Sequence, residues 1–158
     1  MADSSQYEIT LTYPAESGQL TPPAPAYSRN SLMRADGKPE VNASAPAEGG
    51  GEAARYNPEE LMLMSLSQCH MLTYLAIAAK KRIAVVAYTD RATGILGAGS
   101  NGKMSMQAVT LRPRVTVARG SNLADAQAIH DKAHAHCFMA NSVNFPVNNE
   151  AEMVEADA

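Results

Sequence analysis

The sequence predicts an α+β fold with mostly antiparallel sheets around two helices. Several short segments alternate apolar and polar residues, as half-buried strands do, and two longer segments carry helix signals. The predicted order is three strands, a helix, two strands, a second helix and a final strand. A chain of 158 residues, 46% hydrophobic and 18% charged, has the composition of a globular protein. We expect a single domain over 1–158, with an N-terminal strand and linker over 1–26 and an acidic tail over 148–158.

The N-terminal part of the chain predicts a strand and a hairpin. QYEITLTY, residues 6–13, alternates apolar and polar side chains, and the stiff linker TPPAPA follows at 21–26. YSRNSLMR and PEVNA flank the turn sequence ADGK, in which Asp36 and Gly37 favour a tight turn. The next segment, SAPAEGGGEAA, has no periodic pattern and is expected to be a flexible surface loop.

Residues 57–80 predict a long helix. Asn57 can cap it, Pro58 suits its first turn, and Lys80 stands at the end where the helix dipole favours a positive charge. Nearly every face of this helix is apolar, so we expect it to be surrounded on all sides. A single small domain rarely surrounds a helix about 36 Å long, so a partner subunit is expected to cover the remainder.

The C-terminal half predicts further strands and the second helix. IAVVAYTDRATGIL reads as one strand, GAGSNGK as a turn, and KMSMQAVTLRPRVTVA as one long or bent strand. The second helix starts at Asn122, a capping residue, and is expected to run to about Ala140. SVNFPV predicts a last short strand, and the acidic tail NNEAEMVEADA is expected to fray.

Composition excludes several classes of function. The net charge is −3 and no basic patch is dense enough for nucleic-acid binding. The longest apolar run, 61–79, is interrupted by Ser65, Ser67, Gln68 and His70, which argues against a membrane span. The N-terminal residues lack the pattern of a signal peptide, so a cytoplasmic protein is expected. Structural disulfides are rare in that compartment, so the two cysteines are either inert core residues or a chemical pair.

The cysteines are the main candidates for chemistry. Cys69 lies in the long apolar helix, where a free cysteine usually only packs, but Cys137 near the end of the second helix offers a partner. A reactive cysteine needs a stabilised thiolate, and Cys69 is too far from its helix start to use the helix dipole. It would need a cation from elsewhere in the fold, and Arg29 in the YSRNS segment is a candidate.

Four segments together resemble one known family. NPEEL is followed by Cys69 ten residues after Glu59, SRNSLMRADG resembles an N-terminal hairpin with an essential arginine, AHAHC resembles the segment with a second cysteine, and SVNFPV resembles a final strand. In this combination the chain resembles the osmotically inducible protein C and organic hydroperoxide resistance (OsmC/Ohr) superfamily. The resemblance extends from about Tyr27 to Val147.

The resemblance implies an OsmC-like fold, an intertwined homodimer and a thiol peroxidase that needs no cofactor. Cys69 would reduce an organic hydroperoxide to an alcohol and then form a disulfide with Cys137, in defence against oxidative stress. Arg29 would activate the thiolate and Glu59 would hold Arg29. The implied reductant is a dithiol of the lipoyl type. One position departs from the family's best-known branch: Phe138 follows the second cysteine, where a proline is common.

Helix geometry restricts how Glu59 could reach such a site. Ten helical positions separate Glu59 from Cys69, which places them about 80° apart around the axis and roughly 15 Å apart along it. They cannot meet within one helix. Either Arg29 bridges the two residues, or Glu59 comes from the second subunit.

Two other functions fit the same residues. His130, His134 and Cys137 share one helix face and are residue types that zinc accepts, although the sequence positions no fourth ligand. Alternatively, the nine methionines could line a pocket for an apolar ligand in a non-catalytic dimer. His70 and His136 are expected to be surface or packing residues.

Overall fold

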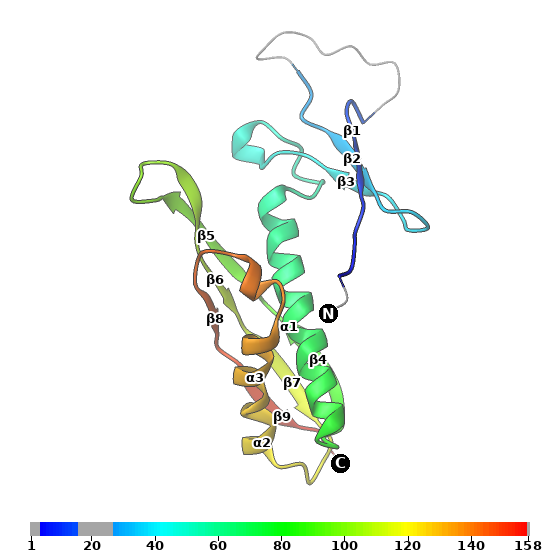
Figure 1. The fold of residues 1–158 in the computed structure, drawn as a ribbon, viewed down its shortest axis with the longest axis vertical. Helices are drawn as coiled ribbons and strands as arrows, with labels where there is room; N and C mark the ends of the chain where they lie inside the picture. The colour runs from blue at the N-terminus through cyan, green and yellow to red at the C-terminus, as the bar shows by residue number, and fades with distance from the viewer. Residues whose placement is uncertain (1–3, 16–26, 158) are drawn as a thin grey trace. The chain divides into compact units, whose positions relative to one another are not determined.

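The computed structural model describes residues 4–15 and 27–157, in two compact units that divide between Leu61 and Met62. The predicted linker at 21–26 lies outside the described residues. Among those described, runs of strands are separated by helices, as in an α+β fold (Figure 1). Each unit is described in turn below.

The first unit contains a three-stranded antiparallel sheet in the order β1-β2-β3. Its strands are β1 (Thr10–Thr12), β2 (Ser31–Arg34) and β3 (Val41–Ala43). The predicted hairpin is confirmed, and Gly37 in its turn has a φ of 69°, which glycine adopts without strain. The predicted first strand is shorter than its alternating pattern suggested. Arg29 precedes β2 rather than lying within it.

The segment after β3 was wrongly predicted to be a flexible loop. It contains a 3-10 turn, η1 (Ala47–Gly49), and it is closed by a hydrogen bond from the Ser44 N–H to the Tyr56 carbonyl at 2.9 Å. Gly50 ends the turn in the left-handed region, with a φ of 78°. The glycines therefore form a defined turn here, because they supply the backbone conformations that it needs.

Helix α1 (Pro58–Lys80) confirms the predicted long helix. The Asn57 side chain accepts from the Glu60 N–H at 2.8 Å, and the Glu60 carboxylate accepts from the Asn57 N–H at 3.1 Å. This reciprocal pair is a capping box, and it explains why the helix starts here.

Within this chain α1 buries one stripe, not all its faces. The buried residues recur every fourth position: Leu66, His70, Tyr74 and Ala78. Met64 and Leu72 on other faces are about half exposed. By length and composition alone α1 could cross a membrane. Here its stripe packs into a protein core, whereas Met62, Met64 and Leu72 remain exposed among the described residues.

Each of the two long strands predicted in the second unit is in fact two strands in different sheets. The sheets have the orders β4-β7-β9 and β5-β6-β8. The strands are β4 (Val85–Asp90), β5 (Thr93–Ala98), β6 (Met104–Leu111) and β7 (Pro113–Val117). The Arg112 N–H donates to the Asp90 carboxylate at 2.7 Å instead of to a backbone carbonyl of a neighbouring strand. Pro113 has no N–H to donate. The ladders therefore break at this point.

The C-terminal elements also differ from their predicted bounds. The second helix is divided into α2 (Leu123–Gln127), capped by Asn122 as predicted, and α3 (Ile129–His136), which ends before Cys137. The last strands are β8 (Val147–Asn149) and β9 (Glu152–Glu155), parallel to β6 and β7 respectively. SVNFPV is thus mostly a connection. The tail is paired rather than frayed, and Glu150 and Glu152 form ion pairs with Arg112 and Arg114.

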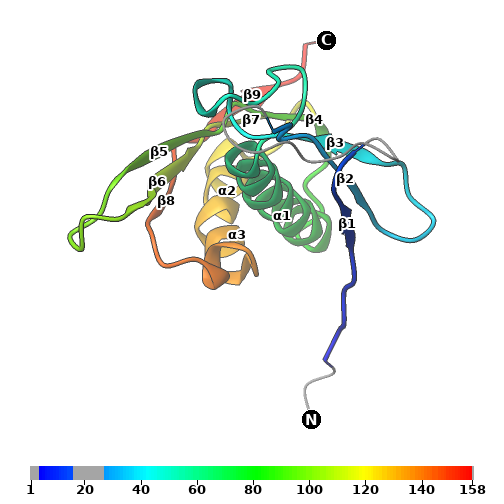
Figure 2. The ribbon, with the colours of Figure 1, turned by 90° about the horizontal axis from the view of Figure 1, so that it is seen from above.

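The core of the second unit lies between its helices and its sheets. Figure 2 shows α1, α2 and α3 on the same side of the strands β4, β5, β6 and β7. Tyr74 and Ala78 of α1 pack with Ile129 and Ala133 of α3 over the β7 residues Val115 and Val117. This packing fixes α1 against α3, the helix that leads to Cys137.

Candidate functional site

Cys69 lies midway along α1 and is half-buried. It directly precedes His70, whose side chain belongs to the buried stripe. The Cys69 carbonyl accepts a hydrogen bond from the Thr73 hydroxyl at 2.8 Å, one turn further along the helix. The Cys69 side chain is therefore held on a regular helix at the edge of the core.

Cys137 is the first residue after α3 and is 1% exposed. Its extended backbone ends the helix, and the chain then forms the 3-10 turn η2 (Ala140–Ser142). The N–H of Ala140 donates to the Cys137 sulfur at 3.4 Å. The turn thus directs a backbone dipole at this sulfur, in the sense that stabilises negative charge.

The structure brings the two predicted cysteines together as free thiols. The Cys69 side chain lies close enough to the Cys137 side chain to affect the protonation of its thiol. Burial, and secondly this proximity to Cys69, raise the pKa of the Cys137 thiol to about 11. The two sulfurs therefore differ in their environments: Cys137 is enclosed and held protonated, whereas Cys69 is accessible.

A groove of about 730 Å³ opens beside Cys69. Apolar side chains from α1 and from the segment after Cys137 contribute most of its lining: Leu72, Ala76, Ile77, Phe138 and Met139. Lys80, Lys132 and His136 add positive or basic groups. Phe138, the residue that replaces the expected proline, is 78% exposed in this chain and borders the groove. The groove can accept an apolar molecule next to the Cys69 sulfur.

Arg29 lies in the first unit, two residues before β2. Its guanidinium stacks on the Tyr27 ring at 4.5 Å and donates to the Gly50 carbonyl at 3.5 Å. A Cβ at position 50 would lie 3.0 Å from the Arg29 Nη1, so a larger residue would crowd the guanidinium. The glycine-rich turn and Tyr27 together orient Arg29.

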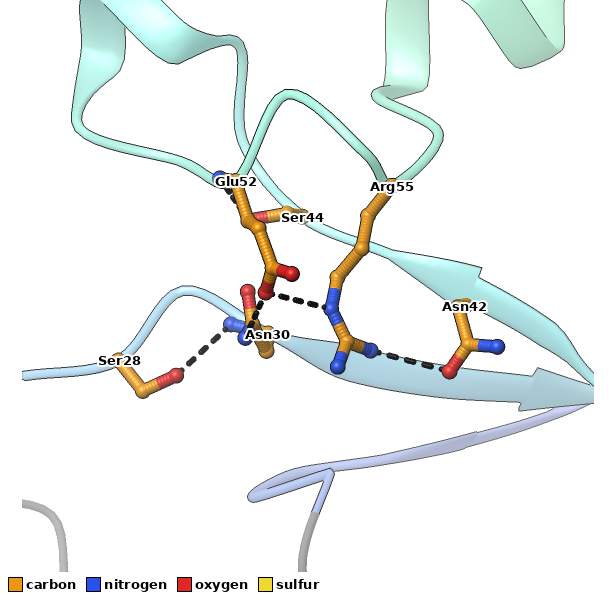
Figure 3. A network of polar contacts seen from close by, with 6 residues as sticks. All are labelled: Ser28, Asn30, Asn42, Ser44, Glu52 and Arg55. Atoms are coloured by element: carbon orange, nitrogen blue, oxygen red, sulfur yellow. Dashed lines mark hydrogen bonds and ion pairs between the residues drawn. The ribbon is translucent and has the colours of Figure 1, made fainter.

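The residues beside Arg29 are tied to the same loop (Figure 3). The Glu52 carboxylate accepts from Asn30 at 2.7 Å and from Arg55 at 2.8 Å, and Arg55 also donates to Asn42 at 3.0 Å. The bonds from Arg55 and then Asn30 lower the pKa of Glu52. This network joins the start of β2, β3 and the loop that follows, so Arg29 lies on a fixed segment.

Glu59 has a buried carboxylate oxygen with no partner. Its Oε2 atom is covered, and no hydrogen bond reaches it from any described residue. In the part of the chain that the structure describes, Glu59 and Arg29 form no ion pair, although the resemblance implies one. The carboxylate that caps the start of the helix is that of Glu60, which accepts from the Asn57 N–H.

The predicted zinc ligands do not converge. Among residues 4–15 and 27–157, no group of three His, Cys, Asp or Glu side chains is placed to hold a metal ion. His130 is instead 2% exposed and bonded to His70 at 3.0 Å. The sequence analysis missed this pair, because His70 and His130 are 60 residues apart and neither lies in a recognisable motif.

Comparison with known proteins agrees with the fold. The sequence matches the family model for OsmC-like proteins over residues 49–152. An OsmC-like protein of unknown function from Vibrio cholerae is 36% identical, with a TM-score of 0.83 over 94% of this chain and 99% of that one. No curated protein matches the sequence.

Two structures titled as organic hydroperoxide resistance proteins share the fold. One, from Elizabethkingia anophelis, is 21% identical, with a TM-score of 0.72 over 99% of this chain and 100% of that one. The other, described as a putative protein of this kind from Vibrio cholerae with captopril in one active site, is 22% identical, with a TM-score of 0.68 over 97% and 95% of the two chains. The family match covers more than half of the sequence, and the paired cysteines lie within it. The chain therefore belongs to the OsmC-like family.

Proposed function

We propose that this protein is a thiol-dependent peroxidase that reduces organic hydroperoxides to alcohols in defence against oxidative stress. The observation that carries the proposal is the proximity of the Cys69 and Cys137 thiols beside an apolar groove. Relatives titled as organic hydroperoxide resistance proteins support the same chemistry. The reducing conditions of the cytoplasm would keep both thiols ready to react.

The environments of the two sulfurs assign their roles. Cys69 lines the groove and can meet a substrate, so it is the attacking sulfur. Cys137 is buried, and its raised pKa makes it a poor first nucleophile. It is, however, within reach of Cys69 and can resolve the oxidised sulfur without a large movement.

The reaction follows from these roles in three balanced steps. The Cys69 thiolate attacks the terminal oxygen of the hydroperoxide, the O–O bond breaks, and the alkoxide takes up a proton and leaves as an alcohol. The Cys69 sulfenic acid then condenses with the Cys137 thiol, which gives a disulfide and water. A dithiol, of the lipoyl type that the resemblance implies, reduces the disulfide and is itself oxidised.

Arg29 and Glu59 complete the proposed site. A guanidinium near the Cys69 sulfur would favour the thiolate, which the apolar groove alone would not. The buried Oε2 atom of Glu59 supports this role, because a buried carboxylate oxygen without a partner among the described residues requires a donor such as a guanidinium. We propose that Glu59 fixes Arg29 in the assembled homodimer, within one subunit or across two.

The experiment is peroxide consumption with cumene hydroperoxide and a dithiol reductant. Cys69→Ser is expected to abolish consumption. Cys137→Ser is expected to consume about one equivalent per subunit and then stop, with a sulfenic acid that dimedone traps. Sustained turnover by Cys137→Ser with the dithiol would remove Cys137 from the mechanism, and full activity of Cys69→Ser would refute the proposal.

The groove also favours a second candidate function, the binding of an apolar ligand without catalysis. Its lining is mostly apolar and includes Met139, a side chain that adapts to different ligands. The same assay separates the two functions. Saturable binding of a fatty acid by a protein that consumes no hydroperoxide would establish the binding function instead.

A further inference from the structure

A histidine pair is buried in the second unit beside the two cysteines. His70 of α1 is 1% exposed, and its Nε2 lies 3.0 Å from the Nδ1 of His130 of α3. The two ring planes differ by only 5°. One ring must donate and the other accept, so the pair is bonded when both rings are neutral and of complementary tautomers.

The surroundings of the pair are mostly apolar. The Tyr74 ring lies 4.3 Å from His130, and the outer nitrogens, His70 Nδ1 and His130 Nε2, are buried with no hydrogen-bond partner among the described residues. Two unmatched nitrogens cost free energy that two aliphatic side chains of similar size would not. The pair is therefore not explained by packing.

The pair joins the two segments that carry the cysteines. His70 directly follows Cys69 on α1, and His130 precedes Cys137 by seven residues, two turns along α3. Asn149 of β8 also donates to His70 Nε2, with its Nδ2 at 2.8 Å, so the single lone pair of that nitrogen is shared between the Asn149 amide and the His130 Nδ1–H. A directional bond between these helices restricts how far one can slide or rotate against the other, which apolar contacts do only weakly.

We propose that His70 and His130 are positioning residues, whose hydrogen bond holds α1 and α3 in the register at which the Cys69 and Cys137 sulfurs meet. The role is distinct from that of Arg29, because neither ring takes part in the attack on peroxide. It deepens the proposed function and rests on it only in that the disulfide is a catalytic intermediate.

The experiment measures how readily the disulfide forms in mixtures of reduced and oxidised glutathione. Two Cys thiols react with oxidised glutathione to give the protein disulfide and two reduced glutathione molecules, and maleimide labelling with intact mass gives the equilibrium constant. His130→Phe keeps a ring against Tyr74 but removes the bond. We expect the equilibrium constant to fall about tenfold or more, because misplaced thiols lose effective concentration.

Two polar variants distinguish positioning from burial. An asparagine amide at position 130 reaches about where Nδ1 lies, whereas a glutamine amide reaches about where Nε2 lies. His130→Asn is therefore expected to recover the wild-type constant to within about threefold, and His130→Gln is expected to remain as low as His130→Phe. This comparison stays available if His130→Phe does not fold, which circular dichroism will show.

The matched control is Ile129→Ala, which removes packing from the neighbouring buried position of α3 and leaves the bond. It should lower the melting temperature but leave the glutathione constant within about threefold of the wild-type value. An unchanged constant in both His130→Phe and His130→Gln would overturn the proposal. So would an equal loss in Ile129→Ala, which would assign the effect to general stability.

Failure of this inference differs from failure of the proposed function. The glutathione exchange involves no peroxide, so a protein that consumes no cumene hydroperoxide would refute the peroxidase and leave the positioning result standing. Conversely, the wild type could consume peroxide while His130→Phe, given one equivalent of hydroperoxide, forms the disulfide at the wild-type rate. That result would support the peroxidase and refute the positioning role.

Discussion

At the scale of single residues, the two sulfurs have the same chemistry and opposite surroundings. Cys137 is enclosed and its pKa is raised to about 11, whereas Cys69 lines an apolar groove. Such a pair needs an outside cation to form the first thiolate. Arg29 stands on a segment fixed by Tyr27 and Gly50, and its guanidinium has no carboxylate partner among the described residues.

Removal of the Arg29 guanidinium tests that role. We expect Arg29→Ala to move the pH profile of Cys69 alkylation to higher pH and to slow peroxide reduction about tenfold or more, because the thiolate loses its cation. Arg29→Lys should recover only part of the lost rate, since an ammonium cannot contact the sulfur and Glu59 in one plane. Arg34→Ala, which removes an exposed arginine of β2, is the control. Equal profiles in wild type and Arg29→Ala would contradict the assignment.

At the scale of elements, α1 is a helix with a defined start and one buried stripe. The capping box of Asn57 and Glu60 satisfies two backbone N–H groups at that start. The stripe places His70 and Tyr74 in the core and leaves Cys69 at its edge. The helix thereby holds the Cys69 sulfur at a fixed position along its axis.

The cap makes a measurable contribution to stability. Asn57→Ala removes the acceptor for the Glu60 N–H, and we expect a loss of about 1 kcal/mol in the free energy of unfolding. Urea unfolding followed by circular dichroism measures it. Asn144→Ala, at an exposed position outside the helices and strands, should change this free energy by only a few tenths. An equal effect of both substitutions would show that the cap is not a stabilising feature.

The histidine pair makes stability depend on pH. Burial, and for His130 also the proximity of His70, lowers the pKa of both rings from 6.5 to about 4. His134 lowers the pKa of His70 further, and Asp90 acts in the opposite direction. Since the unfolded chain binds protons first, the free energy of unfolding should be highest above pH 6.5 and fall as the pH drops towards 4.

The size of this fall is about 3 kcal/mol for each ring that must stay neutral in the folded state. Urea unfolding at a series of pH values and one protein concentration measures it. His130→Phe should reduce the slope between pH 6.5 and 4, whereas His136→Phe, an exposed ring on the same helix, should leave it unchanged. A wild-type slope in His130→Phe would mean that other groups cause the acid sensitivity.

At the scale of the whole molecule, α1 has more apolar surface than one chain covers. Met64 is 46% exposed and Leu72 is 55% exposed, although the helix is apolar on nearly every face. Large exposed apolar side chains in a row on one element are typical of an interface. We therefore expect an obligate homodimer with the α1 helices at its centre.

Sedimentation at micromolar concentration tests the dimer. The wild type should sediment as a dimer, and Met64→Glu should weaken the association about tenfold or more, because a carboxylate would be buried against apolar side chains. Val86→Glu, on β4 and similarly exposed, is the control. A stable wild-type monomer would contradict the prediction, and an effect confined to Val86→Glu would place the interface elsewhere.

Local signals in the sequence determined the elements with clear ends and strong periodicity. Asn57 and Pro58 mark the start of α1, Asp36 and Gly37 mark the hairpin, and Asn122 caps α2, because caps and turns depend on residues a few positions apart. Such features are determined by short-range chemistry, so they can be predicted from one sequence.

Only the tertiary structure decided where long-range contacts override local pattern. The two predicted long strands are divided because Asp90 binds the Arg112 N–H between two sheets, and the acidic tail is paired because Glu152 meets Arg114 across 38 residues. The bond between His70 and His130 likewise spans 60 residues. Sheet ladders, ion pairs and buried hydrogen bonds of this kind form between segments that only the folded chain brings together. No periodicity or motif in the sequence therefore predicts them.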